Sequence, residues 1–187
     1  MDISKIFEKY IEQNKNYKTA YDIVQKNSIG KIWLIGGALS RNMNQLIHKT
    51  PQDSFDFDFI VEEKNDKINL PKGWTIKENK FGNPKFIGEN ISIDFIPMKT
   101  FESIIRNDLK PTIENILSKT PFTIQALAYD TETKKIIGES GLRAFEKKIF
   151  EVNSLEDAKI LADKKGIELN DLISKKAKSM GFKAVLI

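Results

Sequence analysis

The chain has 187 residues, a formal net charge of +4 and 40% hydrophobic residues, which suits a globular domain with a full hydrophobic core. It contains no cysteine and only one histidine, so disulfide bonds, thiolate zinc sites and multi-histidine zinc sites are excluded. No apolar run approaches the ~20 residues that a membrane helix needs, and the N-terminal residues do not resemble a signal peptide. We therefore expect no membrane partner, a cytoplasmic location, and oxygen ligands for any metal.

The first 28 residues are expected to form a helical extension. Apolar residues recur at helical spacing in two stretches, 3–11 and 17–24, before Gly30. The first stretch includes Phe7 and Ile11, and the second includes Tyr17 and Val24. Each pattern predicts an amphipathic helix with one buried face.

A strand, a glycine pair and a helix are predicted next. Residues 31–35 form a short apolar run, and Gly36-Gly37 follows directly. Beyond the glycines, residues 39–47 carry one apolar helix face that includes Leu39 and Met43. Glycine lets the backbone approach a ligand closely, and the bare N–H groups at a helix start favour phosphate groups. The glycine pair is therefore a candidate phosphate-binding turn.

The segment 55–61 alternates phenylalanine with aspartate and then continues with apolar residues. In a strand, successive side chains point to opposite faces, so Asp56 and Asp58 lie on one face and the phenylalanines on the other. Paired carboxylates suit a hard cation such as Mg²⁺ and the phosphate-transfer chemistry that it supports. The alternative is a solvent-exposed carboxylate face on an ordinary amphipathic strand.

The rest of the chain predicts an α/β (α+β) fold with a mixed sheet flanked by helices. Asp94 lies in another alternating strand, 91–96, on the same face as Ser92. Helices are expected at 101–109, at 112–117 and from residue 155 onward, and a buried element at 122–129. The further strands are expected at 74–78, 84–87 and 135–137.

These motifs together resemble the head domain of the poly(A) polymerase and CCA-adding tRNA nucleotidyltransferase family, within the polymerase-beta-like nucleotidyltransferases. The order of strand, Gly36-Gly37, helix and Asp56-x-Asp58 matches that family, and the strand at 91–96 resembles the one with its third carboxylate. The segment 121–130, Pro-Phe-Thr-Ile-Gln-Ala-Leu-Ala-Tyr-Asp, and the segment 155–161 resemble further family motifs in the same order.

The resemblance implies a site for nucleotide and metal. It assigns Asp56, Asp58 and Asp94 as catalytic carboxylates that hold Mg²⁺ (or Mn²⁺), with two ions in the family's mechanism. It places Gly36 and Gly37 near the triphosphate. The other nucleotide-binding candidates are side chains that follow the glycine pair or lie in the later motifs: Ser40, Arg41, Lys99, Lys119, Thr123 and Gln125.

Several positions depart from the family pattern. Ser40-Arg41 stands after the glycines where the family has Arg-Asp one residue earlier, and Pro121 replaces an aspartate. In the family, an aspartate and an arginine of the neck helix recognise the incoming base. Here Asp157 is present, but the position of the arginine holds Ile160. The metal-binding core therefore matches better than the base-binding motif.

The sequence thus predicts an enzyme that transfers a nucleoside monophosphate from an NTP to a hydroxyl, with an RNA 3′ end as the acceptor. The alternatives are a minimal transferase acting on a small molecule or protein hydroxyl, and a degenerate nucleotide- or RNA-binding module. We expect a nucleotidyltransferase head at 29–150 and a partial helical neck at 151–187. A helper subunit would then supply the missing body domain.

Overall fold

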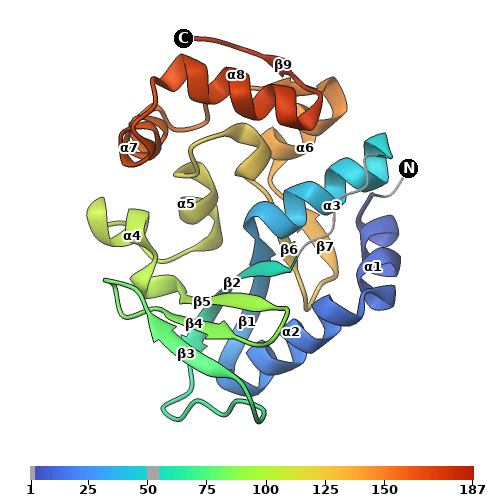
Figure 1. Cartoon of the computed structure of the whole chain (residues 1–187), viewed down its shortest axis with the longest axis vertical. Helices are drawn as coiled ribbons and strands as arrows, with labels where there is room; N and C mark the ends of the chain where they lie inside the picture. Colours follow the sequence, from blue (N-terminus) through green and yellow to red (C-terminus); the bar gives the residue numbers. More distant parts are fainter. Residues whose placement is uncertain (1–2, 50–54) are drawn as a thin grey trace.

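The computed structural model describes residues 3–49 and 55–187, which fold into a mixed sheet flanked by helices (Figure 1). The predicted α/β class is confirmed. Within the described residues, the strands of the main sheet are β1 (Ser28–Ile35), β2 (Asp56–Lys64), β3 (Thr75–Glu78), β4 (Pro84–Ile87), β5 (Ser92–Pro97), β6 (Ala128–Asp130) and β7 (Lys135–Ile137).

The order of the main sheet, over the part of the chain described, is β3-β4-β5-β2-β1-β6-β7. β2 runs parallel to β5 and antiparallel to β1, so it lies at the centre with a neighbour on each side. The register pairs Asp58 with Asp94 across β2 and β5, and pairs Ile35 with Asp58 across β1 and β2. Two strands far apart in sequence therefore bring their aspartates side by side.

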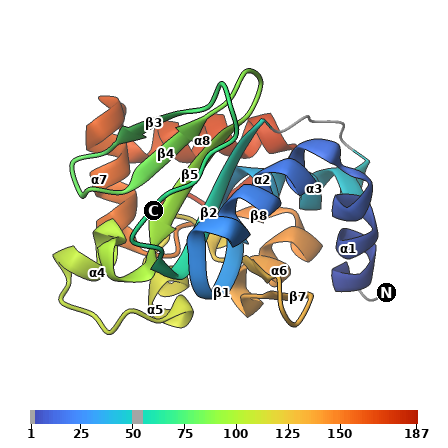
Figure 2. The same cartoon turned by 90° about the horizontal axis from the view of Figure 1, so that it is seen from below.

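The helices are α1 (Ile3–Gln13), α2 (Lys15–Asn27), α3 (Gly36–His48), α4 (Glu102–Arg106), α5 (Ile113–Ser118), α6 (Glu139–Lys147), α7 (Leu155–Lys165) and α8 (Leu169–Met180). Short 3₁₀ turns η1 (Met98–Thr100) and η2 (Thr123–Gln125) connect strands to helices. Figures 1 and 2 show α4 and α5 on one side of the sheet and α1 and α2 on the other.

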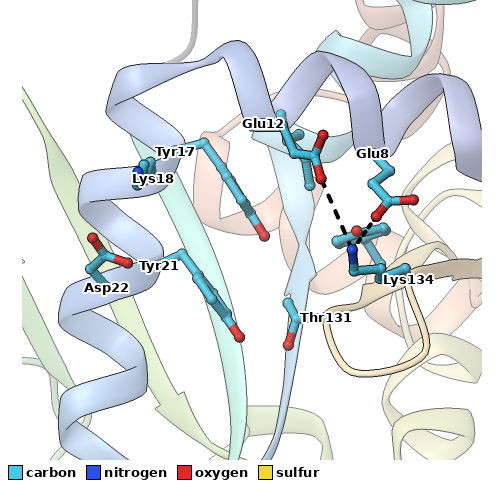
Figure 3. Close-up of a pocket in the computed structure, with 10 residues that line it drawn as sticks. Glu8, Glu12, Tyr17, Lys18, Tyr21, Asp22, Thr131 and Lys134 are labelled. Carbon is cyan, nitrogen blue, oxygen red and sulfur yellow. Dashed lines mark hydrogen bonds and ion pairs between the residues drawn. The ribbon is translucent and has the colours of Figure 1, made fainter.

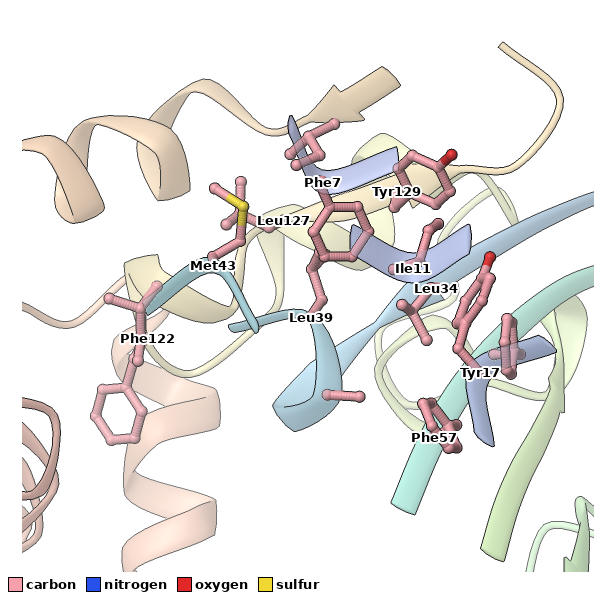
Figure 4. Close-up of a cluster of buried hydrophobic side chains, with 14 of the residues drawn as sticks. Phe7, Ile11, Tyr17, Leu34, Leu39, Met43, Phe57, Phe122, Leu127 and Tyr129 are labelled. Carbon is pink, nitrogen blue, oxygen red and sulfur yellow. The ribbon is translucent and has the colours of Figure 1, made fainter. Parts of the chain in front are cut away.

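The two faces of the sheet bury different clusters, as strand alternation requires. On one face, Phe57 and Phe59 of β2 pack with side chains of α1, α2 and α3, in a core that Figure 4 shows around Phe7 and Leu39. On the other face, Trp33 and Ile60 pack against α4 and α5. Asp58 and Asp94 are in phase with Ile60, so they belong to the face that α4 and α5 cover.

Two helical predictions were wrong in extent. The helix predicted at 101–109 is α4 alone and ends at Arg106, because Asn107 caps the Ser103 carbonyl with its side chain and Asp108 adopts a left-handed φ of 49°. The helix predicted from residue 155 onward is divided at Gly166, which takes a φ of +61° and ends α7.

The last segment adds a feature that the sequence patterns did not predict. β8 (Ile149–Phe150) and β9 (Lys183–Ala184) form a short parallel pair beside α8. Side chains from α1, α3 and α8 belong to one buried cluster, so all three predicted segments of the chain share a core. Over residues 3–49 and 55–187, every helix is too short or too polar to cross a membrane.

Candidate active site

A pair of carboxylates lies at the centre of the sheet face that α4 and α5 cover. Asp58 of β2 and Asp94 of β5 are direct register partners, and their side chains interact with each other. The Nζ of Lys85, on the neighbouring strand β4, donates to Asp94 Oδ2 over 3.0 Å. The ammonium group of Lys85 therefore forms an ion pair with one carboxylate of the pair, that of Asp94.

The environment of Asp58 disfavours its charged form. Burial, together with the negative charge of Asp94, raises the pKa of Asp58 to about 6, while a hydrogen bond from the Gly37 N–H and the charge of Lys85 act in the opposite direction. Two carboxylates that repel each other in a partly buried position favour a bound proton or cation between them. This pair is suited to a cation.

The glycine pair forms the turn between β1 and α3, directly beside Asp58. Gly36 takes a φ of +72°, which residues with a side chain rarely adopt. A Cβ on residue 36 would lie 2.1 Å from Asp58 Oδ2, and one on residue 37 would lie 2.7 Å from Arg41 Nη1. At position 36, glycine is therefore required by both backbone conformation and lack of space.

Asp56 lies two residues before Asp58, at the exposed start of β2. Its carboxylate accepts a hydrogen bond from the hydroxyl of Ser92, its register partner on β5. Among the residues that the structure describes, no three His, Cys, Asp or Glu side chains are close enough together to form a metal site. The structure thus brings Asp58 and Asp94 together and leaves Asp56 on the same face beside them.

A cavity of about 350 Å³ opens next to the carboxylate pair. Typical ligand pockets have volumes of roughly 300–1,000 Å³, so a small molecule fits. Gly36, Gly37 and Asp58 line one part of the cavity, and α7 lines another through Asp157, Ile160, Leu161 and Lys164. Its apolar wall is made by Ile35, Ile96, Phe101, Pro121, Ile160 and Leu161.

Two buried polar atoms of this cavity lack a hydrogen-bond partner within the described residues: Gln125 Oε1 and Ser103 Oγ. Leaving a buried polar atom unpaired costs about 1–3 kcal/mol. Both side chains line the same cavity, one from η2 and the other from α4. The cavity therefore offers hydrogen bonds that a polar ligand can complete.

Arg106 of α4 connects the wall of the cavity to α7. Its guanidinium donates to the carboxylate of Asp157 and lies 3.6 Å from Glu156 and 3.7 Å from Glu102. Asp157 also accepts a 2.5 Å hydrogen bond from Ser154. Lys119 lies 3.6 Å from Glu156, and Lys164 lies 2.7 Å from Glu102. This end of the cavity is a network of opposite charges.

The remaining candidates from the sequence lie outside the wall of this cavity. Ser40 is buried and donates to the Gly37 carbonyl, while Arg41 lies beside Gly37. Thr123 is buried, and its hydroxyl is 3.4 Å from the Glu151 carbonyl. Lys99 pairs with Glu63 over 3.1 Å, at the far end of β2 from Asp58. Of the nucleotide candidates, Gly36, Gly37, Lys119 and Gln125 line the cavity.

Sequence reasoning did not predict the roles of Lys85, Ser103 and Arg106. Lys85 belongs to neither the aspartate motif nor the glycine turn in the sequence. Only the pairing of β4 with β5 brings it to Asp94. Arg106 reaches Asp157 across 51 positions of sequence. The one local signal was the spacing of Glu102 and Arg106, which form an i,i+4 ion pair on α4.

The fold is similar to those of several solved tRNA-processing enzymes. A tRNA-processing enzyme with CTP superposes with a TM-score of 0.56 and 18% identity, over 83% of this chain and 40% of that chain. A CCA-adding enzyme with CTP gives 0.55 and 17%, over 82% and 37%. The Thermotoga maritima CCA-adding enzyme complexed with tRNA gives 0.55 and 14%, over 91% and 45%.

No protein-family model matches the sequence, and no curated protein is similar to it at a significant level. The chain spans less than half the length of each of the three structures named above. At these identities the likeness establishes the fold: the chain has the nucleotidyltransferase head fold of CCA-adding enzymes. The predicted resemblance is thereby confirmed at the level of architecture.

Proposed function

We propose that the chain is a nucleotidyltransferase that transfers a nucleoside monophosphate from an NTP to a hydroxyl of an RNA 3′ end. The observation that carries this proposal is the placement of Asp58, its partner Asp94 and the Gly36-Gly37 turn at one end of a ligand-sized cavity. Nucleotidyl transfer needs carboxylates near the reacting phosphate and backbone N–H groups near the rest of the triphosphate.

The carboxylates would act by holding a divalent cation. The donors are hard carboxylate oxygens on two directly paired strands, so the residues fit Mg²⁺ or Mn²⁺. Asp58 and Asp94 would be the main ligands, with Asp56 reaching in from the next position of β2. Such an ion, when bound, supplies positive charge to the reacting phosphate and lowers the pKa of the attacking hydroxyl.

Other groups of the chain would position the NTP. The N–H groups at the start of α3 would face the triphosphate, and Lys119 would supply positive charge along the same wall. Gln125 Oε1, unpaired within the described residues, would accept a hydrogen bond from a ribose hydroxyl. These contacts would hold the α-phosphate at the carboxylates.

The opposite end of the cavity is suited to the base. Arg106 and Asp157 are hydrogen-bonded to each other, and together they present donors and an acceptor to the cavity. We propose that Arg106 from α4, which pairs with Asp157, takes the part of the arginine that the sequence lacks at position 160. We propose that this pair selects the nucleotide through the polar edge of its base.

The test is transfer of label from each α-labelled NTP, with Mg²⁺ or Mn²⁺, in the presence and absence of tRNA and total RNA. We expect labelled RNA from the wild type, at least a 100-fold loss for Asp58→Asn and Asp94→Asn, and no loss for the exposed control Asp66→Asn. Labelling that needs no RNA would instead indicate a small-molecule or protein acceptor.

A second candidate function is a nucleotide- or RNA-binding module without catalysis. The observation that favours it is that Lys85 neutralises Asp94, while no three metal-ligating side chains converge among residues 3–49 and 55–187. Saturable NTP binding that is independent of divalent metal, without any transfer, would support this function over the enzyme.

A further inference from the structure

A second cavity, of about 370 Å³, lies on the opposite side of the sheet from Asp58. It is lined by α1, α2 and the β6–β7 turn, and Figure 3 shows the side chains that line it. Tyr17 and Tyr129, which line it, pack in the core on the face away from Asp94. The proposed transferase site makes no use of this cavity.

Three phenol groups face the cavity. Tyr17 and Tyr129 are only 7% and 3% exposed, and Tyr21 lies beside Tyr17 on α2. Figure 3 shows the hydroxyls of Tyr17 and Tyr21 both pointing towards the side of the cavity where Thr131 lies. None of the three phenol hydroxyls hydrogen-bonds to a residue in the described part of the chain. Phenol groups that line a cavity and have no protein partner can hydrogen-bond to a polar ligand bound there.

The charges around these phenols favour a cation. Glu8 and Glu12 of α1 both approach the cavity, and Asp22 lies on its rim with Lys18. Burial raises the pKa of Tyr129 above its usual range, and the charges of Glu8 and Glu12 contribute in the same direction. The carboxylates of Glu8 and Glu12 therefore make the electrostatic potential at the Tyr129 oxygen more negative.

Lys134 of the chain already makes the kind of contact that a bound ammonium group would make with Glu8 and Glu12. Lys134, in the β6–β7 turn, places its Nζ against the carboxylate of Glu8 and 4.0 Å from that of Glu12 (Figure 3). An ammonium group is thus accommodated at the mouth of the cavity. The rings of Tyr17 and Tyr21 are stacked, with centroids 6.0 Å apart, and aromatic faces attract cations.

We propose that this cavity binds an organic cation of the alkylammonium class, a diamine or a longer polyamine. One ammonium group would donate to the phenol oxygens of Tyr17 and Tyr129, and the alkyl chain would lie against Ile11 and the tyrosine rings. A second ammonium group would contact Glu12 near the mouth of the cavity. The site is separate from the transferase site and does not depend on its activity.

The test is isothermal titration of the whole protein with 1,4-diaminobutane at fixed ionic strength, compared with 1,4-butanediol, which has the same length and no charge. We expect saturable binding of the diamine and none of the diol. Tyr17→Phe and Glu12→Gln should each weaken diamine binding at least fivefold. Lys134→Met should strengthen it about threefold, because its own ammonium group no longer competes for Glu8 and Glu12.

Two matched variants control for indirect effects. Tyr10→Phe removes a phenol hydroxyl that donates to Gln45, and Glu63→Gln removes a carboxylate that pairs with Lys99, both outside this cavity. Both variants should bind the diamine as the wild type does. Equal binding of the diol, absence of saturable diamine binding, or equal weakening by the control variants would overturn the proposal.

Discussion

Gly36, at the first position of α3, lies so close to Asp58 that a Cβ on the glycine would be 2.1 Å from the carboxylate oxygen Oδ2. Gly36 follows directly after β1, and Asp58 lies on the neighbouring strand β2, where its register partner on β1 is Ile35. The turn that starts α3 and the carboxylate on β2 are therefore one structural unit, and a change in either should disturb the other.

Gly36→Ala should accordingly damage both stability and the site. The left-handed conformation at φ +72° costs a residue with a side chain about 1–2 kcal/mol, and the added methyl group must also displace Asp58. We expect a loss of about 2–4 kcal/mol in the free energy of unfolding, measured with urea, and loss of NTP binding.

Gly73→Ala is the matched control. Gly73 has a φ of +87°, but apart from its chain neighbours no atom lies within 4 Å of the place that an added methyl group would take. The variant should lose about 1 kcal/mol and keep NTP binding. If the two variants lose the same stability and both bind NTP, the contact between residue 36 and Asp58 has no consequence.

Asp58→Asn should stabilise the metal-free protein in a pH-dependent way. The pKa of Asp58 is raised to about 6 in the folded state, against about 3.9 in an unfolded chain. Between these values the folded state binds a proton that the unfolded state has lost, so wild-type stability falls as the pH rises. Above pH ~6 the ionised Asp58 carboxylate destabilises the wild type to its full extent, and the Asp58→Asn variant avoids this loss because its side chain carries no charge.

The measurement is urea unfolding of both proteins, with a chelator present, from pH 4 to pH 8. The stability advantage of Asp58→Asn should be close to zero at pH ~4 and reach about 1–3 kcal/mol above pH ~6. Asp66→Asn, which changes an exposed carboxylate, should show no such trend. A constant difference across this range would contradict the raised pKa.

Much of the sheet could be predicted because its signals are local. Alternation in β2 separates Phe57, which is buried, from Asp58, and the same alternation in β5 places Asp94 in phase with Ser92. The glycine pair before an apolar helix face likewise located the turn at the start of α3. Each of these features depends on a few neighbouring residues and on strand or helix geometry.

The contacts across the cavity could not be predicted, because they depend on how separate elements pack. The ion pair of Arg106 with Asp157 joins α4 to α7, and Lys85 meets Asp94 only through the register of β4 on β5. Because Lys99 follows the strand of Asp94, the sequence predicts it near the nucleotide. In the structure its ammonium group pairs with Glu63, since the parallel strands β2 and β5 end at the same edge of the sheet.

Arg106→Ala should show how far the cavity depends on the ion pair between Arg106 and Asp157. The substitution leaves the buried carboxylate of Asp157 with Ser154 as its remaining side-chain partner, so we expect a loss of about 1–3 kcal/mol in unfolding free energy. Arg143→Ala is the control, because Arg143 is 57% exposed and lies 3.7 Å from Glu151. Its loss should be at most about 1 kcal/mol.

Arg106→Ala should also lower the affinity for NTP at least tenfold, measured by titration, and reduce the preference among the four bases. Arg106→Lys keeps the charge but loses the planar fork, so it should recover stability more fully than base preference. Unchanged base preference in both variants would mean that Arg106 supports α7 without contacting the nucleotide.

The change in burial between Phe55 and Phe57 gives a final test within one short segment. Phe57 is 1% exposed and packs against Tyr17, whereas Phe55, two residues earlier, is 49% exposed. Phe57→Ala should cost about 3–5 kcal/mol in unfolding free energy, because it leaves a cavity in the core between the sheet and α2. Phe55→Ala should cost less than about 1 kcal/mol, since little apolar area is lost from the interior. Equal losses would contradict the burial of Phe57 in the core and the exposure of Phe55 at the start of this strand.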